Sequence, residues 1–423
     1  MRIDPGTSRH ALSFIIVVVL LDAIGFGIIL PVTPKLIIDL AGVDLSNASE
    51  LGGYLMFAYA LMQFFAAPIL GNLGDRFGRR PIILYSLVVL AAGYAMMAAA
   101  PTLIWLFAAR LIAGAASSTF SLAYAYITDI TPENERAQRF GMVGAAFGGG
   151  FVLGPVIGGL LGEYGARVPF VVAAVLAAIN VVYGYFMLGE SLPVSSRRPF
   201  ELKRANPLGA LLALRKYPVV SGLAFAYFLY MLGHLSLPAT WTYYTMEKFA
   251  WSESQVGLSL GYAGVFMIIV QAFLIRWAIP TLGAYRAGLV GLVAMIMGFA
   301  GYALSTESWQ LYAWLALAAL SGFVSPAFQS IMTSQVPANA QGELQGALSS
   351  VNSVTSIIGP LVMTQLFARY TGASTQFYLP GAPFLAAALL TLVSLALFVP
   401  LVRRFGLTAL GKRALDRELP EQT

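Results

Sequence analysis

The chain has 423 residues, of which 58% are hydrophobic and only 10% are charged. Soluble domains are about a quarter charged, so this composition excludes a water-soluble enzyme of this length. The chain has no Cys and only two His, which excludes disulfides, thiolate metal sites, cysteine nucleophiles and a histidine-based metal centre. The net charge of +6 does not by itself indicate nucleic acid, because its meaning depends on where the charges lie.

Apolar segments recur along the whole chain, separated by short breaks that are polar or marked by Gly and Pro. Because a helix needs about 20 mostly apolar residues to cross a bilayer, we predict an all-α membrane protein with twelve transmembrane helices in two six-helix bundles. The expected spans are residues 11–38, 51–72, 81–100, 102–129, 138–163, 167–190, 217–246, 254–276, 282–305, 308–336, 342–368 and 378–403. The first run lacks a small-residue cleavage site and is too long for a signal peptide, so we expect it to be retained.

The longest polar interruption divides the chain into two halves. The predicted parts are an N-terminal bundle at 1–190, a cytoplasmic linker at 191–216, a C-terminal bundle at 217–403 and a cytoplasmic tail at 404–423. Residues 206–218 combine leucines with Arg215 and Lys216, which fits either a short interfacial helix or a plain linker.

The two halves resemble each other. Three features of the first half recur 205 residues later. Pro132 recurs as Pro337, Gly141 as Gly346, and Gly154-Pro155 as Gly359-Pro360. A parallel repeat of this kind is typical of transporters with a central binding site. Chance alignment of Gly-Pro pairs, which are common in membrane helices, is the alternative.

The distribution of Lys and Arg predicts the orientation. With the N-terminus inside, 20 of the 25 basic residues fall on the inner segments, four on the outer segments, and Arg110 within a span. Basic residues are enriched in cytoplasmic loops. We therefore expect both termini to be cytoplasmic in a multi-pass protein of the cell inner (plasma) membrane, and the net charge to report orientation rather than a nucleic-acid partner.

Two charges lie well inside the predicted spans, Asp22 and Arg110. Charged side chains at the bilayer centre are costly and commonly functional. At 1.5 Å per residue both lie near one depth, so a pair, direct or through water, is expected. In the functional interpretation of this pair, we expect Asp22 to take up and release a proton during transport. The alternative is that the pair only ties two helices together.

Uncharged polar residues within the spans are candidates for substrate binding: Gln63, Tyr230, His234, Gln271, Gln329 and Asn352. Each Gln or Asn could instead be a hydrogen-bonding tie between helices, as could Asn180. His234 is a second candidate for titration, or a hydrogen-bonding pocket residue. The aromatic residues around it suit an apolar ligand, but Trp241, Tyr243 and Tyr244 are expected in an interfacial aromatic belt.

Two glycine-rich segments carry motifs. Residues 71–80, GNLGDRFGRR, place Asp75 among three arginines and can form ion pairs that close the ends of two helices. Residues 148–159, GGGFVLGPVIGG, form a small-residue packing face with a Pro bend. The chain has no G-x-x-x-x-G-K-[ST] sequence, which argues against a nucleotide-driven pump.

The first segment resembles the helix 2–3 signature of the major facilitator superfamily, and the second resembles the helix 5 motif of its proton-coupled antiporters. Within that superfamily the chain is similar to the tetracycline/proton antiporter group over most of its length. The matching residues include Asp22, Gly25, Gly27, Pro31 and Pro34 in helix 1; Arg110, Leu111 and Gly114 in helix 4; Pro238, Ala239 and Thr240 in helix 7; and Gln271, Ala272 and Phe273 in helix 8.

The resemblance implies proton/drug antiport by alternating access between two bundles, with Asp22 and Arg110 in proton coupling and Gln271 facing the cavity. The cytoplasmic gate that it implies consists of Gly71, Asp75, Arg76, Gly78, Arg79, Arg80 and Asp129. The helix-packing motif that it implies consists of Gly150, Gly154, Pro155, Gly158 and Gly159.

Three positions depart from the tetracycline carriers. Where those carriers have an Asp in helix 3, this chain has Gly93, and where they have an Asp in helix 9, it has Met295. Where some of them have a His in helix 8, it has Met267. These groups are associated with a metal-chelated drug and its protons. We therefore expect a more apolar, weakly charged or anionic substrate, with Arg110 available to an acid.

The sequence thus predicts a proton-coupled exporter of small hydrophobic or amphipathic compounds, acting as a monomer without a cofactor, metal or nucleic acid. A facilitator or proton symporter for one metabolite or organic acid is the alternative. A membrane sensor or enzyme is disfavoured, because an intramembrane enzyme needs several reactive groups at one depth.

Overall fold

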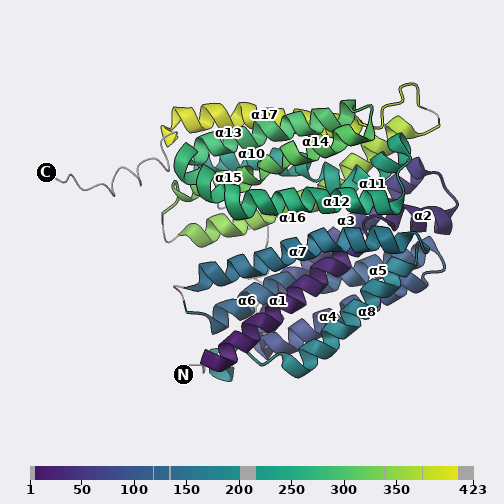
Figure 1. The fold of residues 1–423 in the computed structure, drawn as a ribbon. Helices are drawn as coiled ribbons and strands as arrows, with labels where there is room; N and C mark the ends of the chain where they lie inside the picture. The colour runs from purple at the N-terminus through teal and green to yellow at the C-terminus, as the bar shows by residue number, and fades with distance from the viewer. Residues whose placement is uncertain are drawn as a thin grey trace. The chain divides into compact units, whose positions relative to one another are not determined.

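The computed structural model describes residues 5–117, 119–132, 135–200, 216–337, 340–373 and 375–407. Within these ranges every regular element is a helix (Figure 1). The α-helices are α1 (Pro5–Ile28), α2 (Thr33–Ala41), α3 (Leu45–Phe77), α4 (Arg79–Ala99), α5 (Leu103–Ala116), α6 (Thr119–Ile130), α7 (Arg136–Gly162), α8 (Val168–Met187), α10 (Pro218–His234), α11 (Ser236–Phe249), α12 (Glu253–Ile269), α13 (Ile275–Leu304), α14 (Ser308–Ala318), α15 (Val324–Thr333), α16 (Gln341–Thr371) and α17 (Ala382–Arg404). The short segments η2 (Val194–Ser196), η5 (Val270–Leu274) and η6 (Ala319–Phe323) complete the set.

The described residues contain ten helical stretches long and apolar enough to cross a membrane, and an eleventh if α1 and α2 form one bent span. The longest stretch, Glu253–Leu304, has 52 residues. At 1.5 Å per residue it would be about 78 Å long, more than twice the hydrocarbon core of about 30 Å. Gly283 interrupts it with φ 78°, a conformation that Gly adopts without steric cost. Divided there, the stretch supplies two crossings, at about the expected spans 254–276 and 282–305.

Several spans are broken inside the membrane region. Residues 11–38, expected as one helix, are divided into α1 and α2 with a bend of 48°. Pro31 lies in the break, where its missing backbone N–H removes one helical hydrogen bond, and Pro34 lies in the first turn of α2, where Pro is tolerated. Other breaks fall at Ser117, between α5 and α6, and at η6, between α14 and α15.

Contacts between helices divide the chain into two compact units. Unit 1 comprises Met1–Asn206 and Thr245–Gly264, and unit 2 comprises Pro207–Tyr244 and Val265–Thr423. The helix α12 therefore begins in unit 1 and continues into unit 2. Two expected features lie outside the described residues: most of the candidate interfacial helix at 206–218, and the tail from residue 408 onward.

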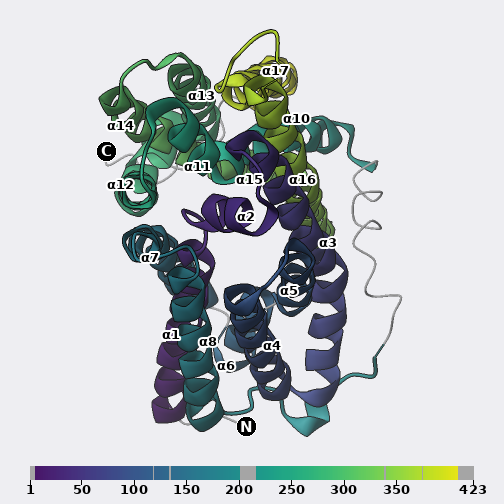
Figure 2. The same ribbon diagram turned by 90° about the vertical axis from the view of Figure 1, so that its right-hand side faces the viewer.

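In unit 1, α1 packs most extensively against α7, and α4 packs against α8 (Figures 1 and 2). Phe14, Ile15 and Val18 of α1 are buried in its core together with Leu87 of α4 and Tyr126 of α6. Because these side chains meet within a bundle that is itself apolar on its outer face, close packing rather than water exclusion holds the helices together.

Unit 2 has an aromatic core. Trp241 and Tyr244 of α11 pack with Tyr302 of α13 and Phe384 of α17, with ring centroids 4.9–6.2 Å apart. Trp241 is 1% exposed and Tyr244 is fully buried, and Tyr243 is buried as well. The expectation of an interfacial belt for these three residues is therefore wrong: their helix turns them toward other helices rather than toward the membrane surface.

Candidate functional site

Asp22 on α1 and Arg110 on α5 belong to a polar site inside unit 1. Asp22 is half-buried and makes no hydrogen bond or ion pair with any described residue; of the two expected arrangements with Arg110, the direct contact is not formed, and a pair through water stays a prediction. Arg110 is 7% exposed, and its Cζ atom lies 5.8 Å from the ring centroid of Tyr59. Tyr59 on α3 and Tyr94 on α4 each lie within electrostatic range of both charges. The two tyrosines, which the sequence reasoning missed as site residues, thus complete the site.

Gln63 is tied to the break between α5 and α6. Its Nε2 donates to the carbonyl oxygen of Ser117 at 3.0 Å and lies 3.1 Å from the Ser117 hydroxyl. Tyr59, one turn earlier on α3, donates its hydroxyl to the same Ser117 side chain. At the break, Gln63 therefore bonds the backbone carbonyl of Ser117 and Tyr59 bonds the Ser117 hydroxyl, so Gln63 serves as a helix–helix tie.

A second polar site lies in unit 2 around the 3₁₀ segment η6. Tyr230 on α10 donates its hydroxyl to the carbonyl oxygen of Ser321 at 3.3 Å. The ring of His234 stacks on Tyr230 with centroids 5.7 Å apart. The Nδ1 atom of His234 is buried and has no hydrogen-bond partner among the described residues. His234 is thus held by stacking on Tyr230, and its buried Nδ1 atom is unsatisfied among the described residues.

Gln271 approaches the same segment from another helix. It lies in η5, a π-helical turn, and such turns occur frequently at functional sites. A β-carbon at Gly322 would lie 3.8 Å from Cγ of Gln271 and 3.5 Å from Sδ of Met267. The absence of a side chain at Gly322 therefore lets η5 pack closely against η6. Gln329 on α15 and Asn352 on α16 are exposed side chains of the same unit.

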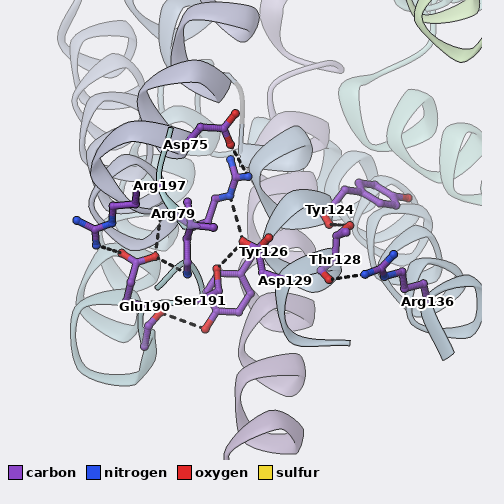
Figure 3. Close-up of polar contacts among 12 residues, drawn as sticks. Asp75, Arg79, Tyr124, Tyr126, Thr128, Asp129, Arg136, Glu190, Ser191 and Arg197 are labelled. Atoms are coloured by element: carbon purple, nitrogen blue, oxygen red, sulfur yellow. Dashed lines mark hydrogen bonds and ion pairs between the residues drawn. The ribbon is translucent and has the colours of Figure 1, made fainter. Parts of the chain in front are cut away.

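Arg79, the first residue of α4, is the centre of an ion-pair cluster (Figure 3). Its guanidinium lies 2.6 Å from Oδ1 of Asp75, one turn earlier, and its Nε donates to Oδ2 of Asp129 on α6 at 3.2 Å. The Arg79 and Asp129 side chains are only 11% and 17% exposed. Three helix ends are thereby joined by three side chains that the sequence singled out.

Residues 190–197, after α8, complete this cluster, and the sequence reasoning did not identify them. Glu190 accepts the backbone N–H of Arg79 at 2.8 Å, and Ser191 donates its hydroxyl to Asp129 at 3.0 Å. Arg197 lies 3.9 Å from Glu190. We call Asp75, Arg79, Asp129, Glu190, Ser191 and Arg197 the Arg79 cluster. The signal for the missed residues was an acidic residue at the start of the basic linker, which complements the arginines of residues 71–80.

Gly78 makes the turn between α3 and α4 possible. Its φ is 106°, which L side chains rarely adopt, and a β-carbon there would overlap the carboxylate of Glu190. Arg80 donates to the carbonyl oxygen of Tyr185 at 2.9 Å. Arg76 is exposed, with its guanidinium 5.0 Å from the Phe77 ring, and Gly71 has open space around it. Arg76 and Gly71 thus lie outside the Arg79 cluster.

The glycines of α7 form two contact faces. Gly150, Gly154 and Gly158 meet α1: a β-carbon at Gly154 would lie 2.7 Å from the carbonyl oxygen of Ile24, and one at Gly158 would overlap that of Ile28. Pro155 joins the same face, because its Cδ atom would lie 2.7 Å from a β-carbon at Gly27 of α1.

The other face of α7 meets the first turns of α12. A β-carbon at Gly159 would overlap the carbonyl oxygen of Glu253, and one at Gly257 would overlap that of Pro155. Glu253 also pairs with Lys35 of α2 at 2.9 Å. The small residues of α7 therefore hold two helices at backbone contact, and an ion pair closes the end of this packing.

No group of three or more His, Asp or Glu side chains that could hold a metal ion comes together in the part of the chain that the structure describes.

Comparison with known proteins assigns the family. The sequence profile of the Major Facilitator Superfamily matches residues 15–360 and 223–413. The chain is 40% identical to a class C tetracycline resistance protein of Escherichia coli, over 94% of this chain and 97% of that protein. It is 35% identical to a class G tetracycline resistance protein of Vibrio anguillarum, over 95% and 99%.

Solved structures have the same fold. The crystal structure of the human organic anion transporter MFSD10 (TETRAN) matches with a TM-score of 0.70 at 24% identity, covering 94% of this chain and all of that one. The nucleoside transporter NupG matches with a TM-score of 0.72 at 16% identity, covering 93% and 99%. The expected fold and the expectation of a transporter rather than an enzyme are confirmed. The chain is a multi-pass membrane protein that belongs to the Major Facilitator Superfamily.

Proposed function

We propose that this protein exports small, largely hydrophobic compounds in exchange for protons, by alternating access, as a monomer in the cell inner membrane. The observation that carries the proposal is the Asp22 site: a half-buried carboxylate within the membrane region, with Arg110 and two tyrosines nearby. Ionisable groups placed in this way are typical of proton relays in transporters. The names of the relatives, which are resistance proteins, favour export over a metabolite facilitator or symporter.

The substrate that we propose is less charged than a metal-chelated drug. Gly93 is a packing contact, since a β-carbon there would lie 3.1 Å from Cβ of Ala113, and Met295 is 2% exposed. A carboxylate at Gly93 would need space that this contact does not leave, and a carboxylate at the buried position of Met295 would lose its hydration. In unit 2, Tyr230, His234 and Gln271 offer aromatic surface and hydrogen bonds, which suit a neutral or weakly charged compound.

The experiment is a growth-inhibition screen of cells that carry the gene, across tetracyclines, other lipophilic drugs and organic acids, repeated with Asp22→Asn and Arg110→Ala. The proposal expects resistance to at least one lipophilic compound, lost in both variants. Resistance that both variants retain would exclude the Asp22 site from coupling.

We propose that the Arg79 cluster is the cytoplasmic gate. Arg79→Gln is expected to reduce transport strongly, because it leaves Asp75 and Asp129 as neighbouring carboxylates without their shared cation; breaking a buried pair in this way costs about 3–5 kcal/mol. Asp129→Asn, which keeps the Asp75 pair, is expected to reduce it less. Initial rates of drug efflux from loaded cells show whether Arg79→Gln loses more transport than Asp129→Asn.

Arg76→Gln is the matched comparison, since it removes an exposed arginine of the same segment outside the cluster. Its effect is expected to be the smallest of the three. Equal losses for Arg76→Gln and Arg79→Gln would show that the arginines act through their charge alone and would contradict the gate.

The proposed orientation, with both termini cytoplasmic, is testable because the chain has no Cys. Tyr164, between α7 and α8, is 83% exposed, and Ser196 in the linker is exposed. In intact cells, a membrane-impermeant maleimide is expected to label Tyr164→Cys and not Ser196→Cys. After permeabilisation both should react. Labelling of Ser196→Cys alone in intact cells would mean that the orientation is inverted.

A further inference from the structure

A cavity of about 350 Å³ lies beside the Arg79 cluster, where α4 begins and α8 ends. Arg80, Arg197 and Glu190 line it together with the aromatic rings of Phe77 and Tyr185. The cavity thus combines cationic groups with apolar surface at one end of the membrane-spanning helices of unit 1. The proposed coupling site does not use this cavity, whereas Glu190 and Arg197 belong both to the cavity and to the Arg79 cluster.

Both arginines of the cavity carry a buried donor without a partner. The Nε atoms of Arg80 and Arg197 are buried and form no hydrogen bond with the residues that the structure describes. Arg80 is held in place by the carbonyl oxygen of Tyr185 at 2.9 Å, and its Cζ atom lies 5.8 Å from the Tyr185 ring centroid. A charged group with an unsatisfied buried donor is costly, so a negative charge beside the two guanidinium groups would stabilise this arrangement.

The charges of the cavity favour an anion. The carboxylate of Glu190 accepts two backbone N–H groups, from Arg79 at 2.8 Å and from Leu192 at 3.1 Å, and lies 3.9 Å from Arg197. Its charge is therefore directed largely toward the backbone. The cavity is lined by two positively charged guanidinium groups and one negatively charged carboxylate, so its net charge is positive. The planar donor geometry of Arg matches the oxygens of a phosphate group.

The apolar side of the cavity indicates that the anion has a hydrophobic part. Phe77 is 49% exposed and Tyr185 is 61% exposed, and the neighbouring Tyr85 and Phe186 are 57% and 76% exposed. On helices that cross a membrane, such side chains face lipid, and exposed Tyr residues are typical of the membrane–water interface. A free phosphate ion would use only the arginines, whereas a phospholipid would use both sides of the cavity.

We propose that this cavity binds the phosphate of an anionic phospholipid. The guanidinium groups of Arg80 and Arg197 attract the phosphate, and the acyl chains lie against Phe77 and Tyr185. The site shares Arg197 and Glu190 with the proposed gate but uses no residue of the Asp22 site, and its test measures lipid binding rather than transport.

The test measures lipid binding to the purified full-length chain in non-ionic detergent by native mass spectrometry. The probes are dioleoylphosphatidylglycerol, which is anionic, dioleoylphosphatidylcholine, which is zwitterionic, and inorganic phosphate. We expect phosphatidylglycerol to bind at least about tenfold more tightly than the other two. One hydrogen bond to a charged group changes an affinity by about this factor. Arg80→Gln and Arg197→Gln should each weaken phosphatidylglycerol about tenfold. The matched control is Arg198→Gln, an exposed arginine that does not line the cavity, and it should bind as the parent does.

Equal affinity of the parent for both lipids, or unchanged phosphatidylglycerol binding in the two Gln variants, would overturn the proposal. Inorganic phosphate that binds as tightly as phosphatidylglycerol and is lost in the variants would mean a free-anion site, which also overturns the lipid assignment. If the Gln variants do not fold, Arg80→Lys and Arg197→Lys keep the charge but replace the planar guanidinium with a compact ammonium. They are expected to bind phosphatidylglycerol more weakly than the parent, and unchanged binding would overturn the proposal.

Discussion

Replacing Asp22 with Asn is expected to abolish drug transport driven by a pH gradient while leaving the protein folded. The substitution keeps the size of the side chain and removes the carboxylate that is proposed to take up and release a proton during transport. Because Asp22 makes no hydrogen bond or ion pair with a described residue, its loss breaks no structural contact in this part of the chain. Uptake of the drug into everted vesicles with an acidic lumen measures the transport that the pH gradient drives.

Two controls separate coupling from general damage. Asp39→Asn makes the same change at an exposed position of the same unit and should transport as the parent does. Exchange of substrate for substrate, which needs no net proton movement, should persist in Asp22→Asn. If pH-driven transport survived in Asp22→Asn, the proposed role of Asp22 would be wrong.

The largest stability effect is expected from Gly158→Ala on α7. A single methyl group there would overlap the carbonyl oxygen of Ile28, so α1 and α7, which make the most extensive helix contact in unit 1, must separate. Overpacking typically costs about 1–3 kcal/mol and more where backbone must move. A lower Tm of the purified protein in detergent is the expected result.

Gly148→Ala on the same helix is the matched control, because a β-carbon there would meet nothing within 4 Å. Ala is a better helix former than Gly by about 1 kcal/mol. The two variants should therefore shift Tm in opposite directions, Gly148→Ala upward and Gly158→Ala downward. A rise of Tm in both would contradict the backbone contact between α1 and α7.

Most of the fold could be predicted because bilayer-crossing helices have a strong hydropathy signal. The hydropathy signal predicts the length and number of the spans. It does not predict the breaks and kinks within them, since these depend on contacts with other helices. The break at Ser117 is stabilised by Tyr59 and Gln63 of α3, and Gly283 makes a kink inside a continuous helical stretch, just within the expected span 282–305. The aromatic residues of α11 were misplaced for the same reason: nearness to a span end does not say which way a side chain points.

The sites were predictable where residues lie close in the chain. Asp75 and Arg79 are one helical turn apart, a spacing that places their side chains together. Glu190, 111 residues after Arg79, joins them only through the packing of α8 beside α4. Asp22 and Arg110 were expected as a pair, direct or through water, because helix length gives the depth of each residue. Whether the two side chains touch depends on how their helices face each other, which is set by packing. The guanidinium of Arg110 lies over Tyr59 instead.

The most direct test of the account is the pH inside proteoliposomes during substrate entry. Purified parent protein is reconstituted with a trapped pH-sensitive dye, and compounds that pass the growth screen, beginning with tetracycline, are added outside. Exchange of each entering molecule for a proton predicts that the lumen becomes more alkaline, with no change beyond that of protein-free liposomes for Asp22→Asn. Acidification of the lumen, or substrate entry without any change of pH, would contradict proton antiport.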